Sequence, residues 1–344
     1  MQLQRATLLL IGVLAAGYAA CVSDDSSGTA PDAGPGQGFD ASVDGTVGND
    51  ATTSGDAAGT DAGAPDASDA ARQPDAPNDA ADAADAPPQL DDAGCPVPTG
   101  VVANAADAGL PATGLALWLR ADLGLATKDG GVVCRWDDVS GNSRAFLPGT
   151  PTPPVVETAG LSGKPSVTFT GNVSYLYRND VLGLPATSGR TFAAYGRSND
   201  TTHRNQYIYQ AAPGTPGTYA GFDTNTFLTA GSREGVYAAN NSFDSNVATS
   251  TTPHSYIFSI ASLVVGSPLP AGLVYAIDGT ATTLTKTAGS GLVEDFSAAN
   301  VTWIGTATDP AFTTKTLGEL LVYDHALTPA ERAAVALYFQ SRYP

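Results

Sequence analysis

The densest set of oxygen-bearing side chains lies in one short stretch, where residues 137–142 are Asp-Asp-Val-Ser-Gly-Asn. Asp137, Asp138, Ser140 and Asn142 carry carboxylate, hydroxyl and amide oxygens, which are hard ligands of the kind that calcium prefers. The same residue types also favour a tight turn between strands for backbone reasons. The stretch predicts a structural turn or a calcium site, and we favour the turn. No cofactor is otherwise required.

Four tyrosines form two pairs with the spacing of a strand face. Tyr175 and Tyr177 are two residues apart, as are Tyr207 and Tyr209. Side chains alternate between the two faces of a sheet, so each pair presents its rings on one face. On an exposed face these rings can stack on sugars, and on an enclosed face they are core residues. The sequence leaves both readings open.

The remaining chemistry-bearing residues favour structural roles. The three tryptophans, Trp118, Trp136 and Trp303, lie in strand-like runs, so we expect them to fill the core. The three histidines, His203, His254 and His325, lie in loop-like contexts, and we expect them at the surface. No Gly-x-Ser-x-Gly elbow is present to position a nucleophilic serine. Basic residues are thinly spread, so nucleic-acid binding is disfavoured.

Residues 1–20 read as an export signal, with one charge at Arg5 and an apolar run, 6–16, that is too short to span a bilayer. Ala19, Ala20 and Cys21 resemble the lipobox of bacterial lipoproteins, in which the cysteine is acylated. Tyr18 departs from that pattern, which usually has an aliphatic residue there. The sequence predicts a protein anchored through Cys21 to the lipid bilayer of the cell envelope, or alternatively one cleaved after Ala19 and secreted.

The cysteine count fits the anchored form. The chain has three cysteines, and acylation of Cys21 leaves Cys95 and Cys134 as an even pair. Exported proteins meet an oxidising compartment, where such a pair forms a disulfide. We predict this bridge, which closes a loop of about 40 residues and stabilises the fold by roughly 3 to 4 kcal/mol.

Most of the acidity belongs to residues 21–94. The net charge is −18, and residues 22–94 contain sixteen Asp, one Arg and no Lys or Glu, which gives −15. Repeated Asp, Ala, Pro and Gly cannot bury enough apolar area to offset the entropy of ordering. We expect a disordered acidic tether here, followed by a nearly balanced domain over 95–344.

The domain over 95–344 has the composition of an all-β sandwich. Short runs rich in β-branched and aromatic residues recur between Gly, Pro, Asn and Asp clusters. The predicted strands cover 115–120, 132–136, 166–170, 191–196, 206–210, 219–223, 255–261, 273–277, 301–305 and 317–323. Val167 and Phe169 alternate with Ser166 and Thr168, which predicts one buried and one wet face. Asp278-Gly279 predicts a two-residue hairpin turn.

One helix is predicted at the end of the chain, from Thr328 to about Arg342. Thr328, Pro329 and Glu331 combine an N-cap hydroxyl, a proline at the first helical position and a partner for a capping box. The apolar positions after them, including Leu337 and Phe339, predict docking against the sandwich.

Four segments in order resemble the laminin-G-like jelly-roll domains of the concanavalin A-like lectin and glucanase superfamily. They are residues 115–122 (LALWLRAD), 133–142 (VCRWDDVSGN), 163–169 (GKPSVTF) and 318–327 (GELLVYDHAL), within a match over about 113–343. The resemblance implies a two-sheet antiparallel jelly-roll sandwich. In relatives its concave face or edge loops bind glycans, calcium or proteins, so the fold does not decide between them.

The sequence lacks the carboxylate motif of the glycoside hydrolases in this superfamily, two Glu flanking an Asp on one strand. The five Glu of the domain lie far apart, and Glu319, the best isolated candidate, falls in the last predicted strand. We therefore expect a surface-displayed, non-catalytic module that binds carbohydrate or an envelope or extracellular polymer. The alternative is protein–protein adhesion or an envelope structural role, and a polysaccharide-active enzyme is the third reading.

Overall fold

A computed structural model describes most of the predicted domain. The described residues are 90, 94–97, 100–149, 152–171, 173–199, 201, 207–211, 222–227, 233–238, 241–269, 272–293, 301–305 and 314–344; of these, the side chains of 209, 211 and 222–227 are not described. The predicted export signal, Cys21 and nearly all of the predicted tether lie outside this set.

Among the described residues, fourteen antiparallel strands form one hydrogen-bonded sheet. Its main path is β15 (Thr280–Ala281), β14 (Leu273–Ile277), β13 (His254–Ser262), β8 (Ser188–Ser198), β18 (Lys315–Tyr323), β6 (Lys164–Phe169), β5 (Val155–Leu161), β3 (Val132–Asp137), β4 (Ala145–Pro148), β7 (Tyr175–Arg178), β17 (Val301–Gly305) and β9 (Ile208–Ala211). Off this path, β1 (Leu115–Arg120) pairs with β18, and β2 (Leu125–Lys128) pairs with β3. A 3-10 turn, η2 (Asp129–Gly131), joins β2 to β3.

A second antiparallel sheet contains four of the described strands. It runs in the order β10 (Phe222–Phe227), β11 (Arg233–Ala238), β12 (Asn241–Ala248) and β16 (Leu284–Ala288). These segments are polar, and β16 is largely exposed. The sequence analysis predicted only the start of β10, because hydrophobic alternation is weak in them.

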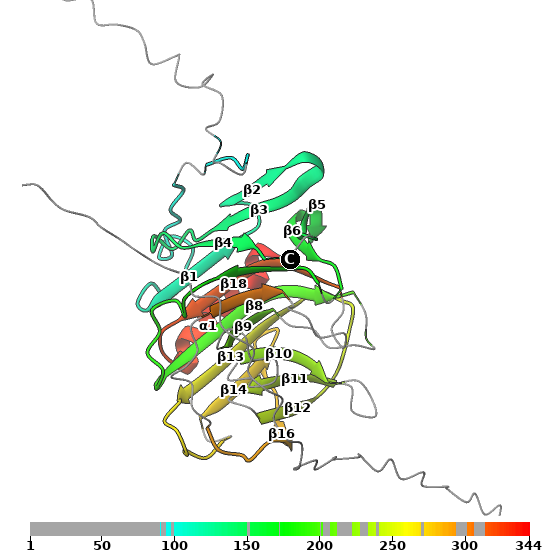
Figure 1. Ribbon diagram of the computed structural model, residues 1–344. Coiled ribbons are helices and arrows are strands. Elements are labelled where there is room, and N and C mark those ends of the chain that lie inside the picture. Colours follow the sequence, from blue (N-terminus) through cyan, green and yellow to red (C-terminus); the bar gives the residue numbers. More distant parts are fainter. Residues whose placement is uncertain are drawn as a thin grey trace, which may run out of the picture. The chain divides into compact units, whose positions relative to one another are not determined.

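The main core lies between two layers of strands. From one layer, β1, β8, β13 and β18 contribute alternate residues such as Leu117, Phe192, Phe258 and Leu320. The facing side chains, which come from β4, β7, β17, β9, β11 and β12, are Phe146, Leu176, Ile304, Ile208, Val236 and Phe243. Figure 1 shows β18, β8 and β13 side by side, as their register requires. The domain is thus an all-β antiparallel sandwich, as the sequence predicted.

The opposite face of β18, β8 and β13 is covered by the helix α1 (Pro329–Arg342). Leu321 and Tyr323 alternate with the inner residues of β18 and pack in a second core with Val335 and Phe339. All nine residues of β18 are buried, because both faces of this strand are covered. The helix therefore acts as a third layer over the middle of the sheet.

The predicted ends of the helix and of one hairpin are confirmed. The Thr328 hydroxyl accepts from the Glu331 N–H at 3.3 Å, and the Glu331 carboxylate accepts from the Thr328 N–H at 2.8 Å. Asp278 and Gly279 both have positive φ values, 50° and 78°, between the paired residues Ile277 and Thr280. This is the backbone that a type I′ turn requires.

Two predictions about faces are wrong. Ser166 and Thr168 lie on the predicted wet face of β6, yet both are buried, and the Thr168 hydroxyl lies 2.9 Å from that of Thr316. Leu337 was assigned to the docking face of α1 but is 64% exposed. In both cases the sequence shows the periodicity but not whether another element covers the face.

Candidate functional site

An outward-facing row of large apolar residues crosses four neighbouring strands. The register pairs Leu147 with Tyr177, Tyr177 with Trp303, and Trp303 with Tyr209. Residues paired directly across strands share one face of a sheet. We call these four positions on β4, β7, β17 and β9 the aromatic row.

The row faces away from the main core. The residues next to it along each strand, which point to the opposite face, are fully buried: Phe146, Leu176, Ile304 and Ile208. Leu147 is 46% exposed, while Tyr177 and Trp303 are partly exposed. Of Tyr209 only the backbone is described. The row therefore offers large apolar surface outside the core.

Tyr175 extends this surface on β7. Its ring meets that of Tyr177 edge-on, with centroids 6.4 Å apart, and its hydroxyl donates to the Gly149 carbonyl at 2.8 Å. A Cβ atom at Gly149 would lie only 2.1 Å from the Tyr175 ring. Residue 149 must therefore be glycine for the two rings to keep this arrangement.

Tyr207 does not belong to an exposed face. It precedes β9, is 3% exposed, and places its ring centroid 5.5 Å from that of Tyr256 in the main core. Burial raises the pKa of its phenol well above the ordinary value. Of the two readings that the sequence left open for Tyr207, a stacking residue or a core residue, the structure shows the core residue; the side chain of Tyr209 lies outside the described set.

The three tryptophans divide between core and surface. Trp118 and Trp136 are fully buried, as predicted, whereas Trp303 is only partly buried. The sequence analysis assigned Trp303 to the core and did not consider Leu147. The alternation of Trp303 with Ile304 shows that they lie on opposite faces, but it cannot show which face is covered.

The polar turn after β3 ties strands together. Asp138 Oδ1 accepts from the backbone N–H of Trp118 and of Ser140, both at 2.9 Å, and its Oδ2 accepts from the Ser140 hydroxyl at 2.8 Å. The Asn142 amide donates to the carbonyls of Leu115 and Ala116 at 3.0 and 3.1 Å. These hydrogen bonds fix the turn to β1.

Asp137, the remaining member of the predicted calcium turn, pairs with Arg135 at 2.7 Å. Its carboxylate points to the arginine on its own strand. Within the described ranges, no group of three or more His, Cys, Asp or Glu side chains is arranged to hold a metal ion. The hydrogen bonds of residues 137–142 are those of a turn between strands.

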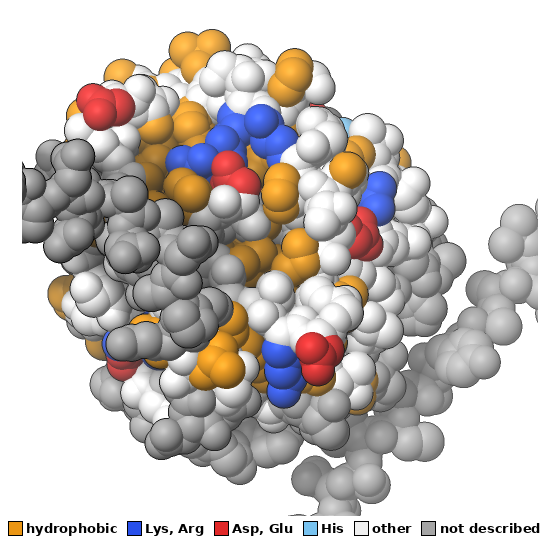
Figure 2. Space-filling view, turned by 90° about the horizontal axis from the view of Figure 1, so that it is seen from above, with side chains coloured by type: hydrophobic (Ala, Val, Ile, Leu, Met, Phe, Trp, Pro, Cys, Tyr) orange, Lys and Arg blue, Asp and Glu red, His pale blue; other side chains and the backbone are white. Residues whose placement is uncertain are grey.

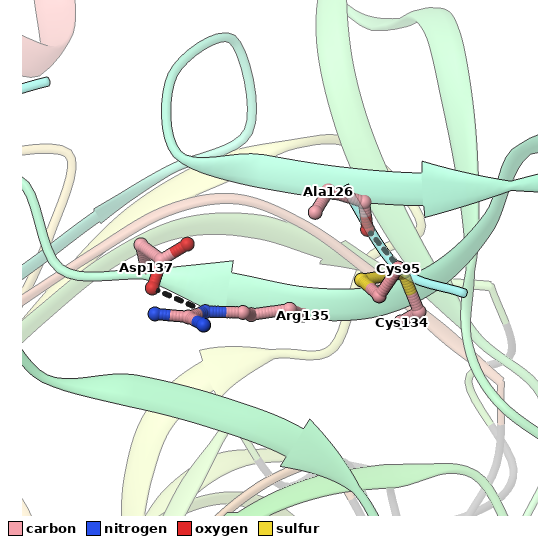
Figure 3. The surroundings of a disulfide bond; sticks show 5 residues. All are labelled: Cys95, Ala126, Cys134, Arg135 and Asp137. Carbon is pink, nitrogen blue, oxygen red and sulfur yellow. Dashed lines mark hydrogen bonds and ion pairs between the residues drawn. A yellow bond between two sulfur atoms is a disulfide. The ribbon is translucent and has the colours of Figure 1, made fainter. Parts of the chain in front are cut away.

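The predicted disulfide is confirmed. Cys95 and Cys134 are joined with an S–S distance of 2.02 Å and a Cα–Cα distance of 6.0 Å. Figure 3 shows the bridge on β3, beside Ala126 of β2, with Arg135 and Asp137 further along the strand. The bond fixes the first described segment of the domain to the β2–β3 hairpin.

Glu319, the best isolated catalytic candidate, is fully enclosed between β18 and α1. Its carboxylate accepts from the Tyr338 hydroxyl at 2.6 Å, the Arg342 Nε at 2.7 Å, the Tyr343 hydroxyl at 3.1 Å and the Trp118 indole N–H. Burial raises its pKa, and these donors oppose that shift. The residue fastens the helix to the sheet.

A second buried carboxyl group, Glu234, escaped the sequence analysis. It lies on β11 inside the sandwich, and burial raises its pKa to about 7, against an opposing effect of His254. His254 is not a bare surface residue, because its Nδ1 lies 2.6 Å from Asp278. Glu234 stands among polar residues, so hydrophobic patterning gives no sign of its burial.

The other two histidines are His325 and His203. His325 is partly exposed, and its Nδ1 lies 2.9 Å from an Asp324 carboxylate oxygen. His203 lies outside the described residues, as does the predicted lipid-attachment residue, Cys21. Among the helices of the described part, none is long and apolar enough to cross a membrane.

No protein-family model and no curated protein sequence matches the chain. Solved structures with a similar fold include the Trypanosoma rangeli sialidase in complex with the inhibitor DANA, at 13% identity and a TM-score of 0.47, covering 66% of this chain and 33% of the sialidase. Another is domain 4 of AbnA, a GH43 extracellular arabinanase from Geobacillus stearothermophilus, in complex with arabinotriose, at 14% identity and a TM-score of 0.44, covering 64% and 98%. A third is the binding domain of Paraclostridial Mosquitocidal Protein 1, at 11% identity and a TM-score of 0.40, covering 66% and 53%. This chain thus spans about a third of the sialidase, and likenesses at this level carry no inference about function.

Proposed function

We propose that the domain is a non-catalytic, laminin-G-like module that binds carbohydrate through the aromatic row. One observation carries the proposal: Tyr177 and Trp303 are adjacent across β7 and β17, on the face that points away from the core. Leu147 extends the same face. Large rings gathered outside the core present an apolar surface that a sugar can cover.

The chemistry of the row suits a sugar ring. The C–H groups on one face of a pyranose or furanose form an apolar surface, and aromatic rings offer a matching flat one. Tyr175 and Tyr177 are held in place by their mutual edge-on contact and by the Tyr175 bond to Gly149. Side chains fixed before binding lose little entropy on binding, which favours affinity.

A protein partner is the second candidate. Aromatic residues with an exposed aliphatic neighbour also make the centres of protein interfaces, and the 46% exposed Leu147 can serve such a contact. Hydrogen-bonding groups are needed to orient a sugar, whereas a protein surface can bind the row mainly by apolar burial. This difference makes Leu147 the useful residue for separating the two.

Attachment to the cell envelope through an acylated Cys21 remains part of the proposal. The Cys95–Cys134 bridge supports it, since disulfides persist in oxidising compartments outside the cytosol. We expect wild-type protein in the membrane fraction and Cys21→Ser protein in the soluble fraction. Retention of the Cys21→Ser protein in the membrane fraction would refute the anchor.

The binding proposal is tested by screening the full chain on a glycan array, with calcium and with a chelator. We expect binding to at least one glycan class, a loss of at least tenfold in affinity for Trp303→Ala, and near wild-type affinity for Trp303→Phe. Leu147→Ala should weaken binding of a protein partner more than binding of a glycan, and Leu337→Ala, which removes an exposed leucine from α1, is its matched control. Absence of any glycan ligand under both conditions would favour a protein partner.

A further inference from the structure

A cavity lies beside the β2–β3 hairpin and includes no residue of the aromatic row. Its volume is about 440 Å³, within the range that small-ligand sites occupy. Its walls come from the segment after the disulfide, from the hairpin, and from the turn after β3. On the side seen in Figure 2, Lys or Arg side chains lie beside Asp or Glu, and hydrophobic side chains surround them.

The residues that line the cavity from the N-terminal side of the domain, Pro96 and 100–102, lie between two fixed points. One is the disulfide of Cys95 with Cys134, and the other is Ala103, whose N–H donates to the Val139 carbonyl at 2.8 Å. Val101 and Val102 line the cavity from this side. The cavity is therefore formed before any ligand arrives.

Two guanidinium groups line the cavity in fixed positions. Arg135 is 30% exposed and donates through Nε to Asp137, so its terminal nitrogens stay available. Figure 3 shows its side chain extended along β3 toward Asp137. Arg144 donates to the carbonyls of Ala116 and Leu182, which holds its guanidinium against the wall.

The two carboxylates that line the cavity, Asp137 and Asp138, are engaged in bonds within the protein. Asp138 is buried and accepts three hydrogen bonds from Trp118 and Ser140. Asp137 uses one oxygen for Arg135, and its other oxygen is enclosed. The groups that the cavity offers to a ligand thus include the terminal nitrogens of Arg135, and Val101, Val102 and Leu125 add an apolar lining.

We propose that this cavity is a second binding site, for an acidic sugar unit. The carboxylate of the sugar accepts from the terminal nitrogens of Arg135, the geometry in which guanidinium binds carboxylates best. The ring of the sugar covers Val101 and Leu125 with its apolar face. The site needs neither the aromatic row nor a bound metal ion.

The test is calorimetric titration of the full chain with sodium glucuronate, compared with glucose and sodium acetate at equal ionic strength. We expect glucuronate to bind at least tenfold more tightly than either. Arg135→Gln should weaken glucuronate binding at least tenfold. Arg178→Gln is the matched control, because Arg178 pairs through Nε with Asp180, two residues further along the chain, as Arg135 pairs with Asp137.

A second variant covers the case in which Arg135→Gln fails to fold. Val101 is 43% exposed, so Val101→Phe should fill the cavity without disturbing the core, and it should abolish glucuronate binding. Glucose or acetate binding as tight as glucuronate, or full binding by Val101→Phe, would overturn the proposal. Trp303→Ala should leave glucuronate affinity unchanged, so failure of the aromatic row and failure of this cavity are separate results.

Discussion

On both outer faces of the sandwich, large apolar residues occupy alternate strand positions, but on one face they are buried and on the other they are partly exposed. On β18, Leu321 and Tyr323 point outward and are buried, because α1 covers them. On β17 and β7, Trp303 and Tyr177 point outward and remain partly exposed. Apolar residues at alternate positions therefore do not by themselves distinguish a second core from a binding surface. What distinguishes them is whether a later element covers that face.

The face of β18 that α1 covers contains a buried, hydrogen-bonded carboxylate. Glu319 lies on the helix side of β18 and receives hydrogen bonds from Trp118, Tyr338, Arg342 and Tyr343. A buried charge is tolerated only when it is paired and hydrogen-bonded in this way. Beside the aromatic row, the Tyr175 hydroxyl donates to the Gly149 carbonyl, which holds this ring at the edge of the surface.

The largest expected effect on stability comes from removing the carboxylate of Glu319, which lies under α1. Glu319→Ala leaves the buried Trp118 indole N–H and Tyr338 hydroxyl without their acceptor and removes one of the two carboxylates that bind Arg342, so we expect a loss of about 3 to 5 kcal/mol in the free energy of unfolding. Urea denaturation followed by fluorescence measures it. Glu157→Ala, at a partly exposed carboxylate, is the control and should change stability by less than about 1 kcal/mol. Similar values for the two variants would contradict the role given to Glu319.

Glu234, which is buried between the layers, should make the free energy of unfolding depend on pH. Its folded-state pKa, about 7, exceeds the ordinary 4.5, so the folded protein binds the proton more tightly than the unfolded chain does. Stability therefore falls as pH rises from about 4.5 to 7, by about 2 to 3 kcal/mol. His254, whose pKa is raised by its hydrogen bond to Asp278, acts in the same direction.

Thermal or urea unfolding at intervals between pH 4.5 and 8 tests this dependence. Glu234→Gln keeps the size of the side chain and removes the ionisation, so its stability should be nearly flat over the lower part of that interval. The remaining slope should come from His254. A wild-type stability that rises steadily from pH 5 to 7.5 would contradict the burial of Glu234 in the sandwich.

The smallest effect concerns the start of α1. Thr328→Ala removes the hydroxyl that accepts from the Glu331 N–H, which should cost about 1 kcal/mol. Urea denaturation again gives the value, and Thr328→Ser should restore most of it. We expect the Thr328 cap to stabilise the protein less than the contacts of Glu319 do. A larger loss in the free energy of unfolding for Thr328→Ala than for Glu319→Ala would contradict this order.

The sequence allowed prediction of features that depend on local chemistry. The capping box at Thr328, the Asp278-Gly279 turn and the strands over 115–120, 273–277 and 301–305 all follow from residues within a few positions of each other. The Cys95–Cys134 bridge followed from counting, because only two cysteines remain for the domain once Cys21 is assigned to the anchor.

Features that depend on distant segments were missed. Polar strands such as β12 form because neighbouring strands pair with them, and Ser242 and Asp244 are buried there despite their types. Tyr207 packs in the core against Tyr256, and Trp303 stays partly exposed on the outer face of β17, and both positions depend on segments that are far apart in the sequence. Tyr175, Tyr177 and Tyr209 were named from spacing, whereas the place of Leu147 and Trp303 on the same face required the register between strands.

The central claim is that the aromatic row binds carbohydrate, and the affinity of Trp303→Ala tests it most directly. Once an array identifies a ligand, calorimetry of wild type, Trp303→Phe and Trp303→Ala should give near-equal affinity for the first two and at least a tenfold loss for the third, with all three equally folded by circular dichroism. Unchanged affinity in a folded Trp303→Ala protein would contradict the claim and place the glycan elsewhere on the domain.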